Sequence, residues 1–206
     1  FFGLRFRYKF LLQWILALII ASILFYQLGY NFIFIRGIGL TSLGFLFIPF
    51  AAFVIVSFTN AFNIADGLDG LASGLLLICL GAFLVISNNQ LDDSLQVFIA
   101  VLMGSMISFL YFNIYKARIW LGDVGSLSLG AVLAVIGLLT GKILAIAFIG
   151  GVFIIEVGSS LIQILSKRFL GRKIMPVAPF HLLLQKMGWD EPKIVMRAWI
   201  LGFSFA

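Results

Sequence analysis

The sequence predicts an all-α polytopic membrane protein. Of its 206 residues, 63% are hydrophobic and 11% are charged, and the mean hydropathy is +1.17. Soluble domains carry about 25% charged residues, so this composition excludes an ordinary soluble core. The apolar residues form long runs separated by short polar stretches, which is typical of transmembrane helices. A membrane β-barrel needs alternating segments of about 10 residues, whereas these runs are longer and do not alternate.

Seven hydrophobic segments are predicted to cross the membrane, at about residues 10–28, 43–59, 71–87, 95–115, 125–140, 143–166 and 194–206. Between the first two, the glycine-punctuated stretch 29–42 predicts a small hairpin at the membrane surface. The chain begins with Phe, and its last apolar run stops after 13 residues, short of the ~20 that cross a bilayer. We therefore expect residues 1–206 to form a single transmembrane domain within a longer protein, lacking its N-terminal spans and the end of its last span.

Lysine and arginine predict the orientation, because these residues gather in cytoplasmic loops. If residue 1 is cytosolic and the spans alternate, twelve of the 14 basic residues fall in cytosolic segments. The outer segments then hold only Arg36 and Lys142. Topology thus explains the net charge of +6, and we expect no nucleic-acid partner. The same orientation brings polar residues of three loops to the cytosolic face and puts Asp92 and Asp93 on the outer face.

A cluster of polar residues follows the second predicted span, in the stretch TNAFNIADGLDGLAS. Asn60, Asn63 and Asp66 are spaced by three residues, so on a helix they lie near one face. The glycines of DGLDG then permit tight backbone turns. Asp69 has a structural alternative, as the N-cap of the helix that begins near Leu71. Polar groups at the end of a span are costly unless paired or hydrated, so two Asn and two Asp within ten residues favour a functional site.

A second cluster, WLGDVGSLSLG, lies between the fourth and fifth spans. Its carboxylate, Asp123, is a candidate ligand for Mg²⁺, which prefers one or two carboxylates together with phosphates and water. The helix amides that follow are a candidate phosphate site. The alternative is that Asp123 or Ser126 only caps the helix. The ring of Trp120 either stacks on a nucleobase or anchors the loop at the membrane interface.

A basic, proline-containing loop follows the sixth span, at residues 167–193. Loops of this length are often functional, and the cations suit anionic phosphates, although the same charges also hold a loop in the cytosol. The loop contains His181, the only histidine. Within the sixth span, Glu156 is a candidate functional carboxylate, with protonation or pairing to a polar group such as Gln163 as alternatives.

Four segments together resemble the phospho-N-acetylmuramoyl-pentapeptide transferases, a branch of the polyprenyl-phosphate N-acetylhexosamine-1-phosphate transferases, or glycosyltransferase family 4. The superfamily patterns NxxNxxDGxDGLA and GDxGSxxLG are similar to TNAFNIADGLDGLASG and GDVGSLSLG. The pattern APxHHHxExxGWxEPKVxxRFWI, specific to the cell-wall branch, is similar to APFHLLLQKMGWDEPKIVMRAWI, and LSARxKLLxQ is similar to LRFRYKFLLQ. The order and spacing of the four agree over nearly the whole chain.

The resemblance implies a catalytic domain in the bacterial inner membrane, in a protein of about ten spans with its active site facing the cytosol. Such an enzyme moves phospho-MurNAc-pentapeptide from UDP-MurNAc-pentapeptide to undecaprenyl phosphate, giving lipid I and UMP in peptidoglycan biosynthesis, with Mg²⁺ as cofactor. It serves cell-wall biogenesis, cell shape and cell division. Members of the family often form homodimers, so a homodimer is one expectation for the oligomeric state.

The resemblance also implies roles for individual residues. Asp123 corresponds to the Mg²⁺-binding aspartate, Asp66 to an active-site aspartate near the metal and diphosphate, and His181 to the first histidine of a catalytic triple. Substrate binding is implied for the remaining matched positions: Asn60, Asn63, Gly67, Leu68, Asp69, Asn113 and Trp120. Of these, Trp120 stands where the family commonly has Phe, which is consistent with stacking on the base.

Three departures from the family pattern are present. The histidine triple is His181-Leu182-Leu183, and the Glu that usually follows it is Gln185. The family's Asp-Asp pair belongs just upstream of the segment that matches residues 4–13, so the chain does not contain it. We therefore expect this chain alone to be inactive and the full-length protein to supply the pair.

Two alternatives stay open. A sibling enzyme that transfers GlcNAc-1-phosphate from UDP-GlcNAc shares the first two motifs, but the GWDEPK segment argues against it. A non-catalytic membrane homologue, such as a transporter, usually shows internal repeats and polar residues near the bilayer midplane. In this sequence the acids cluster at one face and no repeat is evident. In an enzyme, catalysis would rest on neutralising and positioning two anions, the lipid phosphate and the diphosphate.

Overall fold

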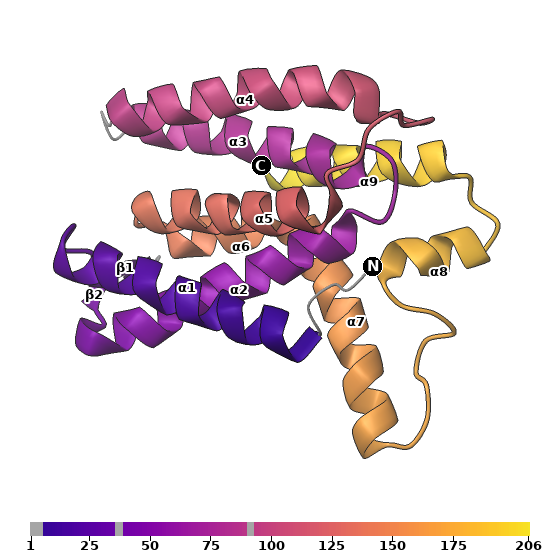
Figure 1. Cartoon of the computed structure of the whole chain (residues 1–206), viewed down its shortest axis with the longest axis horizontal. Coiled ribbons are helices and arrows are strands. Elements are labelled where there is room, and N and C mark those ends of the chain that lie inside the picture. Colours follow the sequence, from indigo (N-terminus) through magenta and orange to yellow (C-terminus); the bar gives the residue numbers. More distant parts are fainter. Residues whose placement is uncertain (1–5, 36–38, 90–92) are drawn as a thin grey trace.

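The computed structural model describes residues 6–35, 39–89 and 93–206, which form a bundle of helices with one small hairpin (Figure 1). Arg36 and Asp92, whose side of the membrane was predicted above, lie outside these residues. The helices are α1 (Phe6–Tyr26), α2 (Phe47–Ala65), α3 (Leu71–Asn89), α4 (Asp93–Asn113), α5 (Gly122–Leu139), α6 (Ile143–Ile149), α7 (Gly151–Phe169), α8 (Phe180–Lys186) and α9 (Glu191–Phe205), with a 3₁₀ helix η1 (Gly44–Leu46) before α2. The predicted all-α class is confirmed.

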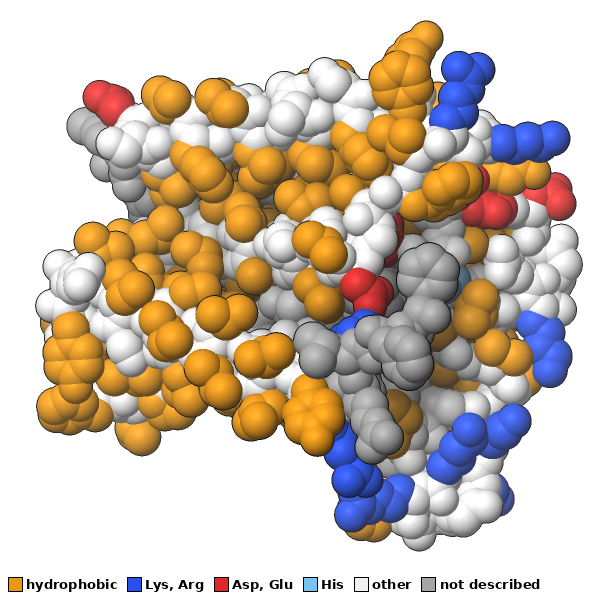
Figure 2. Space-filling model, viewed as in Figure 1, with side chains coloured by type: hydrophobic (Ala, Val, Ile, Leu, Met, Phe, Trp, Pro, Cys, Tyr) orange, Lys and Arg blue, Asp and Glu red, His pale blue; other side chains and the backbone are white. Residues whose placement is uncertain are grey.

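Among the described residues, five helices are long and apolar enough to cross a membrane: α1, α2 together with η1, α3, α4 and α5. Large apolar side chains cover much of the surface of this bundle (Figure 2). A soluble monomer rarely exposes so continuous an apolar surface, which a surrounding bilayer would cover. The protein is therefore a multi-pass membrane protein.

The predicted count of seven spans is not confirmed, because the last two segments are built differently. The sixth segment is divided between α6 and α7 at Gly150. A side chain at Gly150 would lie 2.5 Å from the Phe58 ring and 2.8 Å from the Ile146 carbonyl oxygen, so this approach requires glycine. The seven residues of α6 rise only about 10 Å and the 15 of α9 about 22 Å, against the ~30 Å of the hydrocarbon core.

The hairpin predicted at residues 29–42 is confirmed, and its place at the membrane surface stays a prediction. Strands β1 (Phe32–Ile35) and β2 (Gly39–Ser42) pair antiparallel, with Phe32 opposite Ser42 and Ile35 opposite Gly39. The Tyr30 hydroxyl donates to the Leu139 carbonyl at the end of α5, over 2.8 Å. The hairpin thus lies at the end of the bundle opposite the α2–α3 turn (Figure 1).

The core is organised around α2, which packs against α1, α5 and α7. The ring of Phe62 is fully buried and stacks on Phe153 of α7, with centroids 5.3 Å apart. Gly130 of α5 lies so close to α2 that a Cβ there would be 2.6 Å from the Phe58 carbonyl oxygen. This packing fixes where the first turn of α1, the last turn of α2 and the first turn of α5 meet.

Candidate active site

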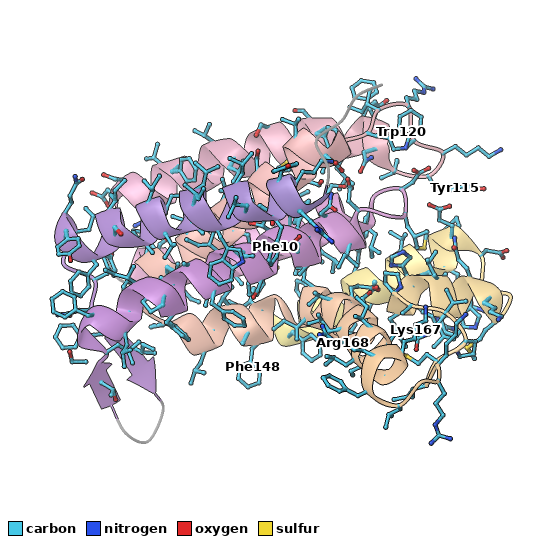
Figure 3. The ribbon with its side chains drawn as sticks, turned by 60° about the horizontal axis from the view of Figure 1, so that its bottom comes forward. Phe10, Tyr115, Trp120, Phe148, Lys167 and Arg168 are labelled. Atoms are coloured by element: carbon cyan, nitrogen blue, oxygen red, sulfur yellow. The ribbon has the colours of Figure 1, made fainter. Side chains whose placement is uncertain are left out.

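The polar residues singled out in the sequence gather at one end of the bundle, where α2 ends and α3 and α5 begin (Figure 1). Lysine and arginine side chains also lie toward this side of the molecule (Figure 2). Figure 3 shows Tyr115 and Trp120 on the α4–α5 loop at this end, and Lys167 and Arg168 on the last turn of α7. The α4–α5 loop meets the distant α2–α3 turn at this end through Asp69.

Asn63 and Asp123 meet across the α2–α5 contact. The Asn63 amide donates to the Ser126 hydroxyl over 2.7 Å and to Asp123 Oδ1 over 3.4 Å. The other carboxylate oxygen, Oδ2, pairs with Lys9 Nζ of α1 at 2.5 Å. Asn60, one turn earlier, donates to Gln13 Oε1 over 2.9 Å. Of these side chains, Lys9, Gln13, Asn60, Asn63 and Asp123 line one hollow of about 110 Å³.

The helix-cap alternative for Asp123 is wrong. The N-cap residue of α5 is Leu121, which makes no side-chain cap hydrogen bond. Asp123 lies in the first turn of the helix, where a negative charge is favoured by the helix dipole, and its side chain is 59% exposed. Ser126 is no cap either, since its hydroxyl donates back to the Gly122 carbonyl. The Asp123 carboxylate is thus held by cationic and amide donors and stays open to solvent.

Asp66 closes the last turn of α2, where its backbone N–H donates to the Phe62 carbonyl over 2.9 Å. Its carboxyl group lies partly buried just beyond the membrane-spanning part of α2. Burial raises the pKa of Asp66 to about 6. The side chain does not line the hollow around Asp123. The structure therefore brings Asp66 to the same end of the bundle as a separate group.

Asp69 connects three segments. Its carboxylate accepts the Ala117 N–H over 2.9 Å and the Trp120 Nε1–H over 3.2 Å, and its own N–H donates to Glu191 Oε1 over 2.6 Å. The predicted alternative of Asp69 as an N-cap of α3 is wrong, because both carboxylate oxygens are directed to the α4–α5 loop instead. Asp69 also lines a mainly apolar hollow of about 230 Å³ between that loop and α9.

The other predicted substrate-binding residues differ in accessibility. Asn113 is 3% exposed, and its amide accepts from the Ser73 hydroxyl and donates to the Ile119 carbonyl, so it holds the α4–α5 loop from inside. Leu68 is buried in the core, whereas Gly67 is exposed. Trp120 is 69% exposed, and apart from its bond to Asp69 the indole is open to solvent.

His181 and Glu156 form a buried pair, each residue 3% exposed. Glu156 Oε2 lies 2.9 Å from His181 Nδ1 and accepts the His181 backbone N–H over 3.3 Å. A Cβ at Gly67 would lie 2.8 Å from His181 Nε2, so the imidazole abuts the DGLDG loop. The alternative that Glu156 pairs with a buried polar group is confirmed, but its partner is His181 and not Gln163, which bonds to the backbone N–H and C=O of Met175.

Sequence reasoning missed Lys9, Gln13 and Glu191 as members of this site. Lys9 and Gln13 stand in a segment that carried part of the family resemblance, and Glu191 stands in the GWDEPK segment. Those matches could have indicated that the three residues belong to the site. A sequence pattern does not show, however, which distant residue each side chain contacts.

The residues around Asp123 suit a divalent cation that also binds substrate. The carboxylate is exposed and already attracts the Lys9 ammonium group. In the described part of the chain, no group of three or more His, Cys, Asp or Glu side chains could hold a metal ion. A single protein carboxylate, completed by phosphate oxygens and water, is the ligand set that Mg²⁺ accepts and a structural metal does not. The exposed carboxylate of Asp123 is compatible with the Mg²⁺ predicted there, and the metal itself stays a prediction.

Comparison with known proteins gives relatives that align with most of this chain. A protein of Borreliella afzelii (strain PKo), named phospho-N-acetylmuramoyl-pentapeptide-transferase, is 36% identical over 224 aligned positions, which cover 99% of this chain and 64% of that protein. A protein of the same name from Borrelia turicatae (strain 91E135) is 38% identical over 179 positions, covering 80% of this chain and 51% of that protein. The chain thus spans less than two thirds of the length of these relatives. The sequence profile described as glycosyl transferase family 4 matches residues 1–141, and because this is more than half of the chain, the chain belongs to that family.

Proposed function

We propose that this protein transfers phospho-MurNAc-pentapeptide from UDP-MurNAc-pentapeptide to undecaprenyl phosphate, forming lipid I and releasing UMP. The observation that carries the proposal is the meeting of Lys9, Asn63 and Asp123 at the end of a membrane-spanning bundle where the 66–70 loop also lies. A site in this position reaches both a lipid phosphate held in the bilayer and a nucleotide dissolved in water. The name that the relatives carry supports this choice of donor and acceptor.

The charges of the site suit the joining of two anions. The Lys9 ammonium group would neutralise phosphate oxygens, and Asp123 would hold Mg²⁺, with Asn63 fixing the Asp123 carboxylate. When bound, Mg²⁺ supplies Lewis-acid polarisation of the diphosphate. The Asp66 carboxyl, at the end of α2, is the candidate group for taking the proton of the lipid phosphate.

The nucleoside of the donor is assigned to the 66–70 loop and Trp120. The Asp69 carboxylate accepts two N–H groups here, and a uracil ring offers an N–H of the same kind. The exposed indole of Trp120 offers a face for the base. The site is proposed to face the cytosol from the bacterial inner membrane, because most basic residues belong to segments at its end of the bundle.

The test is release of UMP by the full-length protein in detergent, with undecaprenyl phosphate, Mg²⁺ and either UDP-MurNAc-pentapeptide or UDP-GlcNAc as donor. UMP is expected from the first donor only, with loss of activity in EDTA. Asp123→Asn is expected to lower kcat by about 10²-fold or more, because it removes a charged group that acts on the transition state. Asp93→Asn, a carboxylate at the other end of α4, is the matched control and is expected to keep wild-type activity.

The results of this assay distinguish the proposed enzyme from a sibling transferase and from a protein without enzymatic activity. UMP from UDP-GlcNAc alone would assign the protein to the sibling GlcNAc-1-phosphate transferases. No UMP from either donor, with the protein folded, would contradict an enzymatic function. Full activity in EDTA would contradict the role given to Mg²⁺.

A further inference from the structure

Residues of α8 and α9 contact the 66–70 loop on its inner side. Three contacts reach it from there. The His181 imidazole abuts Gly67, Glu191 Oε1 accepts the Asp69 N–H over 2.6 Å, and the Trp199 indole N–H donates to the Gly70 carbonyl over 3.2 Å. The C-terminal segment therefore contacts the loop at its start, middle and end.

Of these contacts, the hydrogen bond from the Asp69 N–H to Glu191 has the most direct effect on the exposed groups of the site. It fixes the backbone of Asp69, whose carboxylate in turn accepts the Ala117 N–H and the Trp120 Nε1–H. The position of Asp69 thus determines where the α4–α5 loop and the Trp120 indole lie. A movement of the Asp69 backbone would shift all of these groups together.

Glu191 is well suited to a fixed role. It is the first residue of α9, where the helix dipole favours a carboxylate, and Pro192 sets the backbone of the first turn. The side chain is only partly exposed, and its carboxylate makes a charge-assisted bond to a backbone N–H. The acceptor is therefore already oriented by its own helix.

Anchoring of α9 does not require this bond. The helix is docked on α3 so closely that a Cβ at Gly74 would overlap the Trp199 ring at 2.2 Å, and one at Gly202 would lie 2.7 Å from Leu75. Ile194 and Val195 are also buried. Removing the Glu191 carboxylate would leave α9 in place and free the Asp69 backbone.

We propose that Glu191 is a positioning residue that sets the Asp69–Trp120 pair for the nucleoside part of the donor. This inference rests on the proposed function, because that function assigns the nucleoside to the pair. Glu191 itself does not touch the reacting phosphates. Its loss is therefore expected to weaken donor binding rather than the chemical step.

The experiment compares full-length wild-type protein with Glu191→Ala, Glu191→Gln and the control Asp190→Ala, which removes an exposed carboxylate one residue earlier that makes no side-chain cap hydrogen bond. Glu191→Ala is expected to raise the KM for UDP-MurNAc-pentapeptide about tenfold, with kcat changed by less than about threefold, because a uniform binding contact is lost. The KM for undecaprenyl phosphate is expected to stay the same. Glu191→Gln keeps an acceptor oxygen and is expected to recover most of the donor KM.

A second readout does not depend on activity. Hydrogen–deuterium exchange of a peptide covering residues 66–72 is expected to be faster in Glu191→Ala and unchanged in Asp190→Ala, because the Asp69 N–H loses its acceptor only in the first variant. Faster exchange with an unchanged donor KM would make the contact merely structural and overturn the proposal. Unchanged exchange, or equal rises in both KM values, would also overturn it. If wild-type protein releases no UMP, the proposed function fails, while the exchange rates still decide whether Glu191 holds the loop.

Discussion

At the scale of single residues, Asp66 gives the clearest pH dependence. Its pKa is raised from 3.8 to about 6 by burial, so the folded protein binds a proton more tightly than the unfolded chain. Stability is therefore expected to fall as the pH rises from about 4 to about 6, and the full penalty is present above pH 6. Because Asp66 is partly exposed, we expect a penalty of only about 1 kcal/mol. Asp66→Asn is expected to raise the melting temperature at pH 8 and to have little effect near pH 4.

The measurement is thermal unfolding in detergent with EDTA, followed by tryptophan fluorescence at several pH values. Asp93→Asn, at the opposite end of the bundle, serves as the control for loss of a carboxylate. A variant of Asp66 that is less stable than wild type at pH 8 would show that its ionised form is favoured in the folded protein.

The residues of the site were largely visible in the sequence, but their partners were not. Asn63 and Asp66 stood out as polar groups at the end of a span, and Asp123 as a carboxylate at the start of a helix. Asp69, in contrast, was open to interpretation as a helix cap, and its contact with Glu191 joins positions 122 residues apart. No local pattern encodes such a pair, because it depends on how α9 docks on α3.

At the scale of secondary-structure elements, the α2–α5 contact is expected to be the least tolerant of added volume. A Cβ at Gly130 would meet the Phe58 carbonyl oxygen at 2.6 Å and the Thr59 Cα at 2.8 Å. Backbone atoms cannot rotate aside as a side chain can, so Gly130→Ala is expected to cost about 2–3 kcal/mol. It is also expected to separate Asn63 from Asp123 and so to lower activity.

Gly104→Ala is the matched comparison, because a Cβ at that position of α4 meets no atom within 4 Å. There the intrinsic helix preference of alanine is expected to stabilise the protein by up to about 1 kcal/mol. Melting temperatures in detergent would test both changes. Equal effects at the two glycines would mean that α2 and α5 are not packed as closely as described.

Helices and strands could be predicted from the sequence where local composition alone indicates them. The five long spans and the hairpin at residues 29–42 follow from apolar runs and from glycine punctuation. The division between α6 and α7 was missed, because the apolar run continues through Gly150. At Gly150 the backbone lies against the Phe58 ring of α2, a tertiary contact that hydropathy does not register.

At the scale of the whole molecule, the predicted orientation in the membrane can be tested on α4, whose two ends are marked by exposed charged residues. Asp93 begins this helix and Lys116 follows its end, so the 21 residues between its bounds rise about 31 Å, enough to cross the hydrocarbon core. Lys116 belongs to the loop that contacts Asp69, at the site end of the bundle. The basic residues of the site end are expected to stay in the cytosol, so Asp93 is expected to face outward.

Cysteine labelling tests this orientation directly. In intact cells, a membrane-impermeant maleimide is expected to label Asp93→Cys, and to label Lys116→Cys only after the membrane is permeabilised. The wild-type protein, whose Cys79 is buried at 2% exposure, is the control and is expected to stay unlabelled. Labelling of Lys116→Cys in intact cells would place the site on the outer face, where the basic residues around it would oppose the usual charge asymmetry of membrane proteins. Because every element of the site lies at the same end of the bundle as Lys116, this one comparison decides from which side of the membrane the nucleotide must arrive.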